Sequence, residues 1–313
     1  MQTKPFFMLA LCLALAILLP GCSSTSHRLG GKAIGVPSSS SAMEALLMQP
    51  GPVEFESVNS ADWSGPLAGL LNLNSPAAIE AGLRNREEPL QVYAHVLKHP
   101  RHGNFLVDTG IAQMVNDDPQ KAGLSWMLVK FMRKENLVLR KSTAAILKDL
   151  PGKLSGVFFT HLHFDHITGM PDIPDGVPLY VGPSESTDKY WLNMFVQGSS
   201  NRLLHGKAQL QEWDFQPDPQ GRLEGLIDVF EDGSVFAISV PGHTAGSTAY
   251  LIRTTKGPVL LTGDTSHTRW GWDHSVEPGA FTHYQERNRK SLLQLKHLVN
   301  RYPNITVLVG HQP

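Results

Sequence analysis

The sequence predicts a protein of the α/β class, and three observations support this prediction. Short apolar runs that read as strands occupy residues 157–159, 236–240, 259–261 and 306–309. Segments with the apolar period of helices lie between them. The chain has 313 residues with 41% hydrophobic content, which is enough for a substantial core. One large α/β domain and two smaller ones are both consistent with this length.

Residues 1–21 have the layout of a secretory signal peptide. Lys4 precedes an unbroken apolar run at residues 6–19, which is too short to span a bilayer comfortably as a helix. The sequence Leu-Pro-Gly-Cys at residues 19–22 resembles a bacterial lipoprotein box, in which cleavage precedes Cys22 and that cysteine is lipidated. The alternatives are an ordinary signal peptide and an uncleaved anchor. Ser23 stands where an Asp would indicate inner-membrane retention, so we expect a periplasm-facing lipoprotein of the bacterial cell envelope, held in the outer membrane.

The segments that follow lead into the main domain. Residues 22–41 are rich in Ser and Gly and have no apolar period, which predicts a flexible tether, and residues 42–313 form the domain with an N-terminal extension. Ser75 before a proline predicts a helix start. Alternation over residues 90–108 predicts a hairpin with its turn at residues 101–104. Three histidines of this hairpin are expected to face solvent: His95, His99 and His102.

Helices are predicted on both sides of the central strand. One runs from Asp118 to about residue 135, with Leu124, Leu128 and Phe131 on one face, and Ser142 caps a second. A further helix covers residues 289–302. Residues 184–204 carry four large side chains at helical spacing, which either pack on the sheet or wall an apolar pocket: Tyr190, Trp191, Met194 and Phe195.

The polar cluster that follows the strand at residues 157–159 has the composition of a metal site. His161, His163 and Asp165 alternate, so in an extended segment their side chains share one face. His166 must point elsewhere, which suits a second metal ion. Imidazole and carboxylate without thiolate suit Zn²⁺ and also admit Mn, Fe or Co. The only cysteines are Cys12 and Cys22, so all metal ligands of the mature domain must be nitrogen or oxygen.

Three more potential ligands follow strands in the same manner. His243 comes after residues 236–240, Asp264 after residues 259–261, and His311 after residues 306–309. The H-x-H-x-D-H string with these later residues resembles the metallo-β-lactamase fold superfamily, over roughly residues 90–313. The resemblance implies a four-layer αββα sandwich.

The resemblance also implies a role for each ligand. One metal would be held by His161, His163 and His243, a second by Asp165, His166 and His311, and Asp264 would bridge the two. Asp108, in a sequence that resembles the early D-x-G element of the family, would orient a ligand histidine or would only form a turn. The implied chemistry is attack by a metal-bridging hydroxide on a carbonyl ester, with Asp165 able to carry a proton to the leaving oxygen.

The expected substrate is a small molecule, most simply a lactone. The His directly after Asp165 is absent from the motif of most true β-lactamases, and the compact domain is similar to acyl-homoserine lactonases. These carry a Tyr three residues after the bridging Asp, where this chain has His267. A histidine can donate a hydrogen bond in the same place, and a structural or solvent-facing role is the alternative for this residue. The alternatives are a thioesterase of the glyoxalase II type, which is disfavoured because the chain stops two residues past His311, and another ester or phosphodiester hydrolase. A non-catalytic, lipid-anchored metal-binding protein is an alternative of another class.

Charge narrows the possible partners. The formal net charge is −1 and there is no long basic run, so a nucleic-acid substrate has no electrostatic support. The membrane is expected as a partner only through lipidated Cys22. The oligomeric state stays open at this level.

Overall fold

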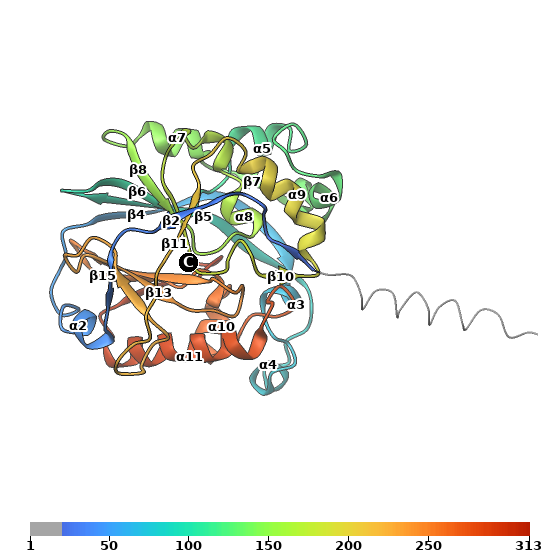
Figure 1. Cartoon of the computed structure of the whole chain (residues 1–313). Helices are drawn as coiled ribbons and strands as arrows, with labels where there is room; N and C mark the ends of the chain where they lie inside the picture. The colour runs from blue at the N-terminus through green and yellow to red at the C-terminus, as the bar shows by residue number, and fades with distance from the viewer. Residues whose placement is uncertain (1–20) are drawn as a thin grey trace, which may run out of the picture.

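Two large β-sheets face each other in a computed structural model of the chain, which describes residues 21–313 (Figure 1). The larger sheet has the strand order β2-β11-β9-β8-β6-β5-β4-β7, the smaller has the order β16-β15-β14-β13-β12-β3, and β1 pairs with β10. The strands are β1 (Cys22–Ser23), β2 (Leu29–Lys32), β3 (Val36–Ser38), β4 (Glu54–Pro66), β5 (Glu87–His99), β6 (Gly103–Val107), β7 (Val138–Leu139), β8 (Leu154–Phe158), β9 (Leu179–Val181), β10 (Lys189–Tyr190), β11 (Leu210–Glu212), β12 (Leu226–Asp228), β13 (Val235–Ser239), β14 (Thr248–Thr254), β15 (Gly257–Leu261) and β16 (Thr306–Leu308).

Helices cover the outer face of each sheet. The α-helices are α2 (Ser40–Glu44), α3 (Leu67–Leu70), α4 (Pro76–Glu80), α5 (Gln113–Asp117), α6 (Trp126–Met132), α7 (Thr143–Lys148), α8 (Phe164–Ile167), α9 (Asn193–Leu203), α10 (Arg269–His274) and α11 (Gln285–Arg301). In Figure 1, α5, α6, α7 and α9 lie above the larger sheet, and α2, α10 and α11 lie below the smaller one. Among residues 21–313, no helix combines the length and apolar character that crossing a membrane requires.

Three apolar cores separate these four layers. One contains Leu106 and Val157 with Leu128 of α6, between the larger sheet and its helices. A second contains Phe158 and Tyr250, one from each sheet. The third joins the smaller sheet to α11 and α2. The predicted αββα sandwich is therefore confirmed.

Strand direction places the ends of several strands at one edge of the sandwich. In the larger sheet, β6, β8, β9 and β11 run parallel. In the smaller sheet, β13 and β15 are each antiparallel to β14, so they share a direction, and β16 is parallel to β15. The segments that follow β8, β13, β15 and β16 can therefore meet, as ligand-carrying loops do at the carboxyl ends of strands.

Local sequence signals account for several helix starts. The hydroxyls of Ser75, Ser125 and Ser142 each accept a hydrogen bond from the backbone N–H three residues later. The helix predicted from Asp118 to residue 135 is wrong in extent, because Gly123 adopts a left-handed φ of 109° and only Trp126–Met132 is α-helical. Phe131, predicted to share the buried face with Leu128, is exposed instead.

The N-terminal segment differs from its prediction. The signal-peptide prediction falls almost entirely on residues 1–20, which lie outside the described residues. Residues 22–41 were expected to form a flexible tether, but β2 extends the larger sheet beside β11, and β3 pairs with β12 of the smaller sheet. The physical reason is that the edge strand of a sheet has unpaired backbone N–H and C=O groups. These can pair with the backbone of a segment whose side chains show no apolar period.

The hairpin β5–β6 is confirmed, but two of its histidines are buried rather than solvent-facing. His95 lies between the rings of Phe55 and Tyr93, with centroids 5.9 and 5.6 Å away. His99 is buried and lies 3.1 Å from Asp232 Oδ2. His102 is exposed, as expected. Phe55 of β4 packs on His95, and Phe230 and Asp232, from the segment between β12 and β13, contact His99. Alternation along β5 alone did not reveal these contacts.

Candidate metal centre

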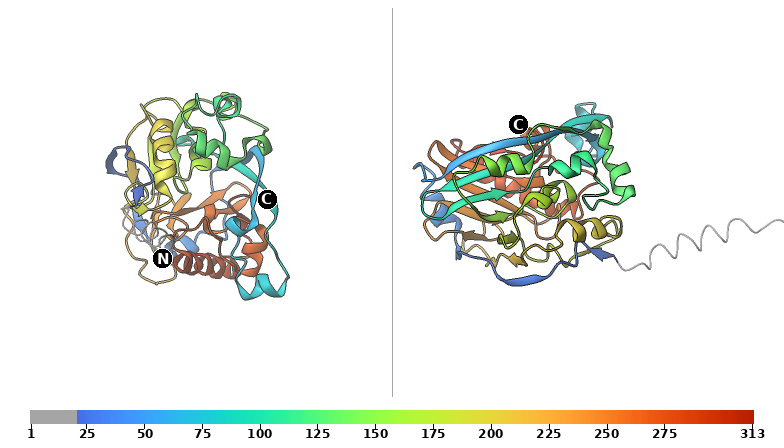
Figure 2. Two further views of the ribbon diagram at one scale, coloured as in Figure 1. Left: turned by 90° about the vertical axis from the view of Figure 1, so that its right-hand side faces the viewer. Right: turned by 90° about the horizontal axis from the view of Figure 1, so that it is seen from above.

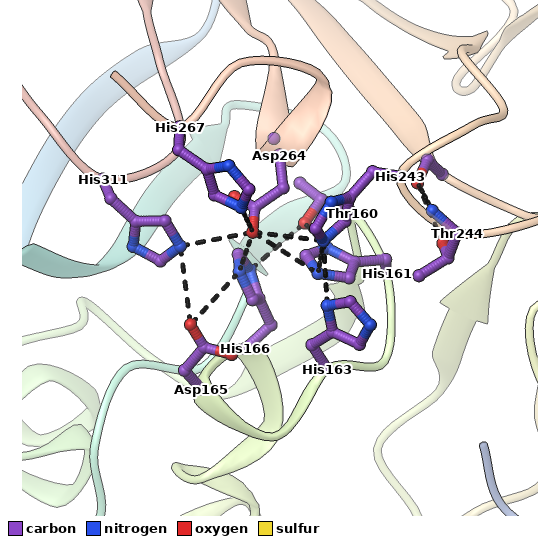
Figure 3. Close-up of polar contacts among 12 residues, drawn as sticks. Thr160, His161, His163, Asp165, His166, His243, Thr244, Asp264, His267 and His311 are labelled. Atoms are coloured by element: carbon purple, nitrogen blue, oxygen red, sulfur yellow. Dashed lines mark hydrogen bonds and ion pairs between the residues drawn. The ribbon is translucent and has the colours of Figure 1, made fainter. Parts of the chain in front are cut away.

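The central motif bends from strand to helix, which spreads its side chains around one point. His161 follows β8, His163 is the N-cap residue of α8, and Asp165 and His166 lie in the first turn of that helix. Neighbouring positions of a helical turn point in different directions. Asp165 and His166 are thereby directed to a separate cluster from His161 and His163 (Figure 3).

Three histidines form the first cluster. Nε2 of His243 lies 3.1 Å from Nε2 of His161 and 2.8 Å from Nδ1 of His163. Ligand atoms bound at about 2.1 Å in a tetrahedron would be roughly 3.4 Å apart. Both separations are somewhat shorter than this, so the three nitrogens point at one position, and slight outward movement of the rings would give the spacing of ligands around a single ion.

The second cluster consists of Asp165, His166 and His311. Oδ2 of Asp165 lies 3.4 Å from Nε2 of His311 and 3.9 Å from Nε2 of His166. Asp264 stands between the clusters, and dashed lines from both converge on it in Figure 3. Its Oδ2 atom lies 3.6, 3.4, 3.4 and 3.3 Å from Nε2 of His161, His243, His166 and His311, respectively. The structure thus brings together all seven residues that the sequence nominated as ligands.

The outer nitrogens of these rings are hydrogen-bonded, which orients the inner nitrogens. Nδ1 of His166 contacts Oδ2 of Asp108 at 2.8 Å, and Nδ1 of His311 contacts the carbonyl of Gln91 at 2.8 Å. Because a carbonyl and an ionised carboxylate only accept hydrogen bonds, both Nδ1 atoms carry protons. Hydrogen bonding of this kind is usual for histidines that bind metal.

The inner atoms fit a cation. Among residues 21–313, the buried atoms Nε2 of His166 and Oδ1 of Asp264 have no hydrogen-bond partner. Buried polar atoms of this kind are costly unless an ion or a proton satisfies them. The donor set of imidazole nitrogens and carboxylate oxygens matches Zn²⁺ and similar divalent ions.

The electrostatics of the two clusters differ. Burial, reinforced by neighbouring histidines, holds the pKa of His161, His163 and His243 well below the usual value, so these rings are neutral. Burial also opposes the charged form of His166, but the carboxylates of Asp108, Asp264 and Asp165 outweigh it and raise its pKa. The first cluster offers lone pairs, whereas the second lies in a field that attracts positive charge.

His267 lies inside the site but does not face open space. Its Nε2 atom is 3.0 Å from Oδ2 of Asp264, and its Nδ1 atom is 3.1 Å from the carbonyl of Leu70. The side chain is buried. In this structure His267 therefore contacts the central carboxylate. The sequence had left a hydrogen bond to the substrate and a structural role as alternatives for this residue.

Two further residues support the site, and sequence reasoning missed both. Oε1 of Glu185 accepts from the N–H of Leu162 at 2.8 Å, and Oε2 accepts from the hydroxyl of Thr244 at 2.5 Å and from the N–H of Gly246 at 3.0 Å. Glu185 thus joins the loop of His161 to the loop of His243. Its position on a separate loop carried no signal in the sequence.

The second missed residue is His283. Its Nε2 atom lies 3.5 Å from Nε2 of His163, and its ring stacks on Tyr190 with centroids 3.7 Å apart. Burial lowers the pKa of His283 to about 4, so the ring is neutral and can accept the proton of His163. No motif marks this histidine, because only the loop before α11 brings it to the site.

Several known proteins are similar to this chain in sequence and in fold. N-acyl homoserine lactonase AttM from Azorhizobium caulinodans is 26% identical over 221 residues, which cover 70% of this chain and 80% of the relative. AttM from Agrobacterium fabrum is 27% identical with the same coverage. A solved N-acyl homoserine lactone hydrolase, with N-hexanoyl-L-homoserine bound at its metal centre, superposes with a TM-score of 0.54 at 20% identity, covering 85% of this chain and 94% of that one.

The family to which the chain belongs is shown by a sequence match that covers most of its length. The sequence pattern of the Metallo-beta-lactamase superfamily matches residues 88–311. This range begins in β5 and ends at His311, so it contains all seven residues of the two clusters. The chain belongs to the metallo-beta-lactamase superfamily.

Proposed function

We propose that this protein is a dinuclear metal-dependent hydrolase that opens lactones, with acyl-homoserine lactones as the substrate class. One observation carries the dinuclear assignment: a single oxygen, Oδ2 of Asp264, lies 3.3–3.6 Å from inner nitrogens of both clusters. A carboxylate in that position can bridge two ions. Bound divalent ions would supply Lewis acidity, which lowers the pKa of water and polarises a carbonyl.

The ligand sets follow from the clusters. His161, His163 and His243 would hold one ion, Asp165, His166 and His311 the other, and Asp264 both. Zn²⁺ is the best match to these nitrogen and oxygen donors, with Mn, Fe or Co also compatible. Glu185, Asp108 and His283 would keep the ligands in place through the contacts described above.

Asp165 is placed to handle a proton during ring opening. Its side chain is 13% exposed, whereas that of Asp264 is 2% exposed, so Asp165 lies nearer the substrate side. A carboxyl group there can hold a proton at Oδ and pass it to the ring oxygen as the ester bond breaks. His267 would act through Asp264, whose Oδ2 atom it contacts.

The lactone preference rests on the relatives. The AttM lactonases match 70% of this chain and 80% of their own length at 26–27% identity. Thioester and phosphodiester hydrolysis would use the same metal chemistry and remain alternatives. This chain has His267 at the position where acyl-homoserine lactonases carry a Tyr, so experiment must decide which lactone is the substrate.

We also propose that residues 1–21 direct export and that Cys22 is lipidated, which would place the enzyme on the periplasmic side of a bacterial outer membrane. The Leu-Pro-Gly-Cys sequence supports this proposal. Mass spectrometry of the mature N-terminus tests it. Diacylglycerol on Cys22 is the expected result, and an unmodified N-terminus downstream of Cys22 would overturn it.

Hydrolysis measured by pH-stat tests the enzymatic assignment. The panel contains long- and short-chain lactones, a glutathione thioester, an aryl ester, a β-lactam and a phosphodiester, each with metal-loaded protein. We expect the lactones to turn over fastest, and Asp264→Asn to abolish turnover while circular dichroism shows a retained fold. Faster turnover of the thioester or phosphodiester would replace the substrate assignment. A metal-loaded protein without activity on any substrate would support a metal-binding role.

A further inference from the structure

Large apolar side chains gather on one exposed face of the molecule. We define the aromatic patch as six residues, three from α6 and three from the start of α9 and the residues just before it: Trp126, Met127, Phe131, Trp191, Met194 and Phe195. All six are exposed, and Trp126 and Trp191 retain 65% and 57% of their surface. Tryptophan side chains are highly buried on average, so an exposed fraction this large is unusual. A contiguous exposed apolar patch is typical of an interaction site.

The two segments of the aromatic patch are held side by side. The N–H of Ser125 donates to Oγ of Ser199 at 2.9 Å, and Nε of Arg202 donates to the carbonyl of Gly123 at 2.5 Å. These bonds fasten the start of α6 to α9. In Figure 1 and in the right-hand view of Figure 2, α6 lies next to α9, and α9 lies beside the start of the described chain.

The exposed face of α6 combines apolar and basic groups. Met127, Lys130 and Phe131 are three to four residues apart, so they lie on one side of the helix, and all are exposed. Lys189, two residues before Trp191, is also exposed. Aromatic rings flanked by Lys or Arg are typical of surfaces that rest at the interface between lipid and water.

The N-terminal strand meets the fold at the aromatic patch. In β1, Cys22 pairs with Tyr190, the residue before Trp191. Oγ of Ser23 accepts from Nε2 of Gln197 at 2.9 Å, and Oγ1 of Thr25 donates to Oδ1 of Asn201 at 2.7 Å. β1 therefore runs along α9, and Cys22 lies beside the residue that precedes Trp191. The lipid proposed on Cys22 would then enter the bilayer beside the aromatic patch.

We propose that the aromatic patch rests on a phospholipid bilayer, with Trp126 and Trp191 at headgroup depth and Lys130 and Lys189 facing lipid phosphates. Docking would also orient the metal centre. Tyr190, which pairs with Cys22, stacks on His283, and His283 contacts His163. The side of the metal centre that carries His163 would then lie close to the membrane, where a lactone with a long acyl chain accumulates. The docking surface does not depend on the proposed activity, because neither the aromatic patch nor β1 contains a metal ligand.

Depth-dependent fluorescence quenching on the full chain tests this proposal. The protein is reconstituted into vesicles of phosphatidylcholine and phosphatidylglycerol that carry a nitroxide on the acyl chain. We expect strong quenching of part of the tryptophan emission, and loss of this part in the double variant Trp126→Phe, Trp191→Phe. The variant keeps an apolar surface, so it should stay bound, and circular dichroism checks its fold.

A matched control reports the opposite end of the molecule. Met48 is 73% exposed and lies four residues after the end of α2. In Figure 1, α2 lies at the opposite side of the molecule from α6 and α9. Met48→Trp in the double variant should give emission that lipid nitroxides do not quench. Equal quenching at Met48→Trp, or no quenching in the wild type, would overturn the proposal. Protection of Trp126 and Trp191 from aqueous iodide without lipid quenching would instead indicate a second copy of the chain, and protection only on adding a long-chain lactone would indicate a substrate groove.

Discussion

Asp108 holds His166 by a hydrogen bond of 2.8 Å between Oδ2 and Nδ1, and this contact fixes where Nε2 of His166 points. The same carboxylate accepts from the N–H and the hydroxyl of Thr160, each at 2.8 Å. Asp108 adopts a left-handed φ of 55°, which is uncommon for a residue other than glycine. The surrounding contacts therefore maintain a strained residue whose effect is to orient a ligand.

Asp108→Asn should weaken metal binding at the second cluster. The amide cannot accept from His166 and Thr160 in the same way, and it removes the negative charge that increases the basicity of the ring. We expect metal affinity to fall about 10- to 100-fold, measured by competition with a chelating dye. Asp175→Asn, at an exposed carboxylate that pairs with Lys207, is the matched control and should bind metal normally. Unchanged affinity in Asp108→Asn would show that the contact is structural only.

Glu185→Gln should loosen the connection between two ligand loops. Both oxygens of the carboxylate accept hydrogen bonds, from Leu162, Thr244 and Gly246. Glutamine replaces one of these oxygens by an NH₂ group, which can only donate, so two donors would face each other. A lost buried hydrogen bond of this kind costs about 1–3 kcal/mol. We expect a fall of that size in the free energy of unfolding, measured in urea, together with weaker metal binding. Glu224→Gln, at a half-buried carboxylate that pairs with the exposed Lys290 far from the metal centre, should change neither quantity.

His267→Ala should impair turnover by freeing Asp264. Because Nε2 of His267 lies 3.0 Å from Oδ2 of Asp264, its removal leaves the central carboxylate less constrained. We expect kcat to fall by about two orders of magnitude, the range typical of a lost electrostatic contact at the reacting centre. His267→Gln keeps a hydrogen-bond donor and should recover part of the rate. A variant with normal kcat and raised KM would indicate that His267 contacts the substrate instead.

Removing metal should lower thermal stability. The inner atoms of the two clusters are buried, and bound ions stabilise only the folded state. Free metal at 100 times its Kd contributes about 2.7 kcal/mol for each site. Dialysis against a chelator should therefore lower Tm, and Zn²⁺ should restore it, as scanning calorimetry can show. The metal content by mass spectrometry should return to two ions per chain, and a stable content of one would overturn the dinuclear assignment.

His95 should make the fold sensitive to acid. Burial lowers its pKa to about 4, so between pH 6.5 and 4 the unfolded chain binds a proton that the folded chain does not. The neutral form stabilises the fold above pH 6.5, and this stability is lost as the pH falls toward 4. The shift corresponds to about 3 kcal/mol at most.

His95→Phe supplies the comparison. The ring packs between Phe55 and Tyr93, and Nδ1 of His95 is buried without a hydrogen-bond partner among residues 21–313, so phenylalanine fits the site. The free energy of unfolding of this variant should fall less steeply with acid than that of the wild type. If the free energy of unfolding fell equally steeply with acid in both proteins, His95 would not be the cause of the acid sensitivity.

The ligand set was predictable because it is local. The spacing of His161, His163, Asp165 and His166 is contained in one short segment, and each later ligand directly follows an apolar run that forms a strand. Strand ends are easily recognised, and parallel strands place their ends at the same edge of a sheet. These local signals, together with the family resemblance that they carry, nominated seven ligand positions before their distances were known.

Tertiary contacts decided the residues that support those ligands. Glu185, His283 and Tyr190 reach the centre from loops and strands distant in sequence, and no local pattern marks them. His95 and His99 read as solvent-facing because the residues that bury them come from distant segments: Phe55 lies in β4, and Phe230 and Asp232 lie between β12 and β13.

By itself, the sequence determined the class of fold and the chemistry of the centre, because apolar periodicity and ligand spacing are properties of short segments. Only the tertiary structure decided that residues 22–38 join the sheets as edge strands, since backbone hydrogen bonding needs no side-chain signal. It also decided that His267 faces Asp264. The direction of a side chain depends on everything packed around it, and that information is distributed over the whole chain.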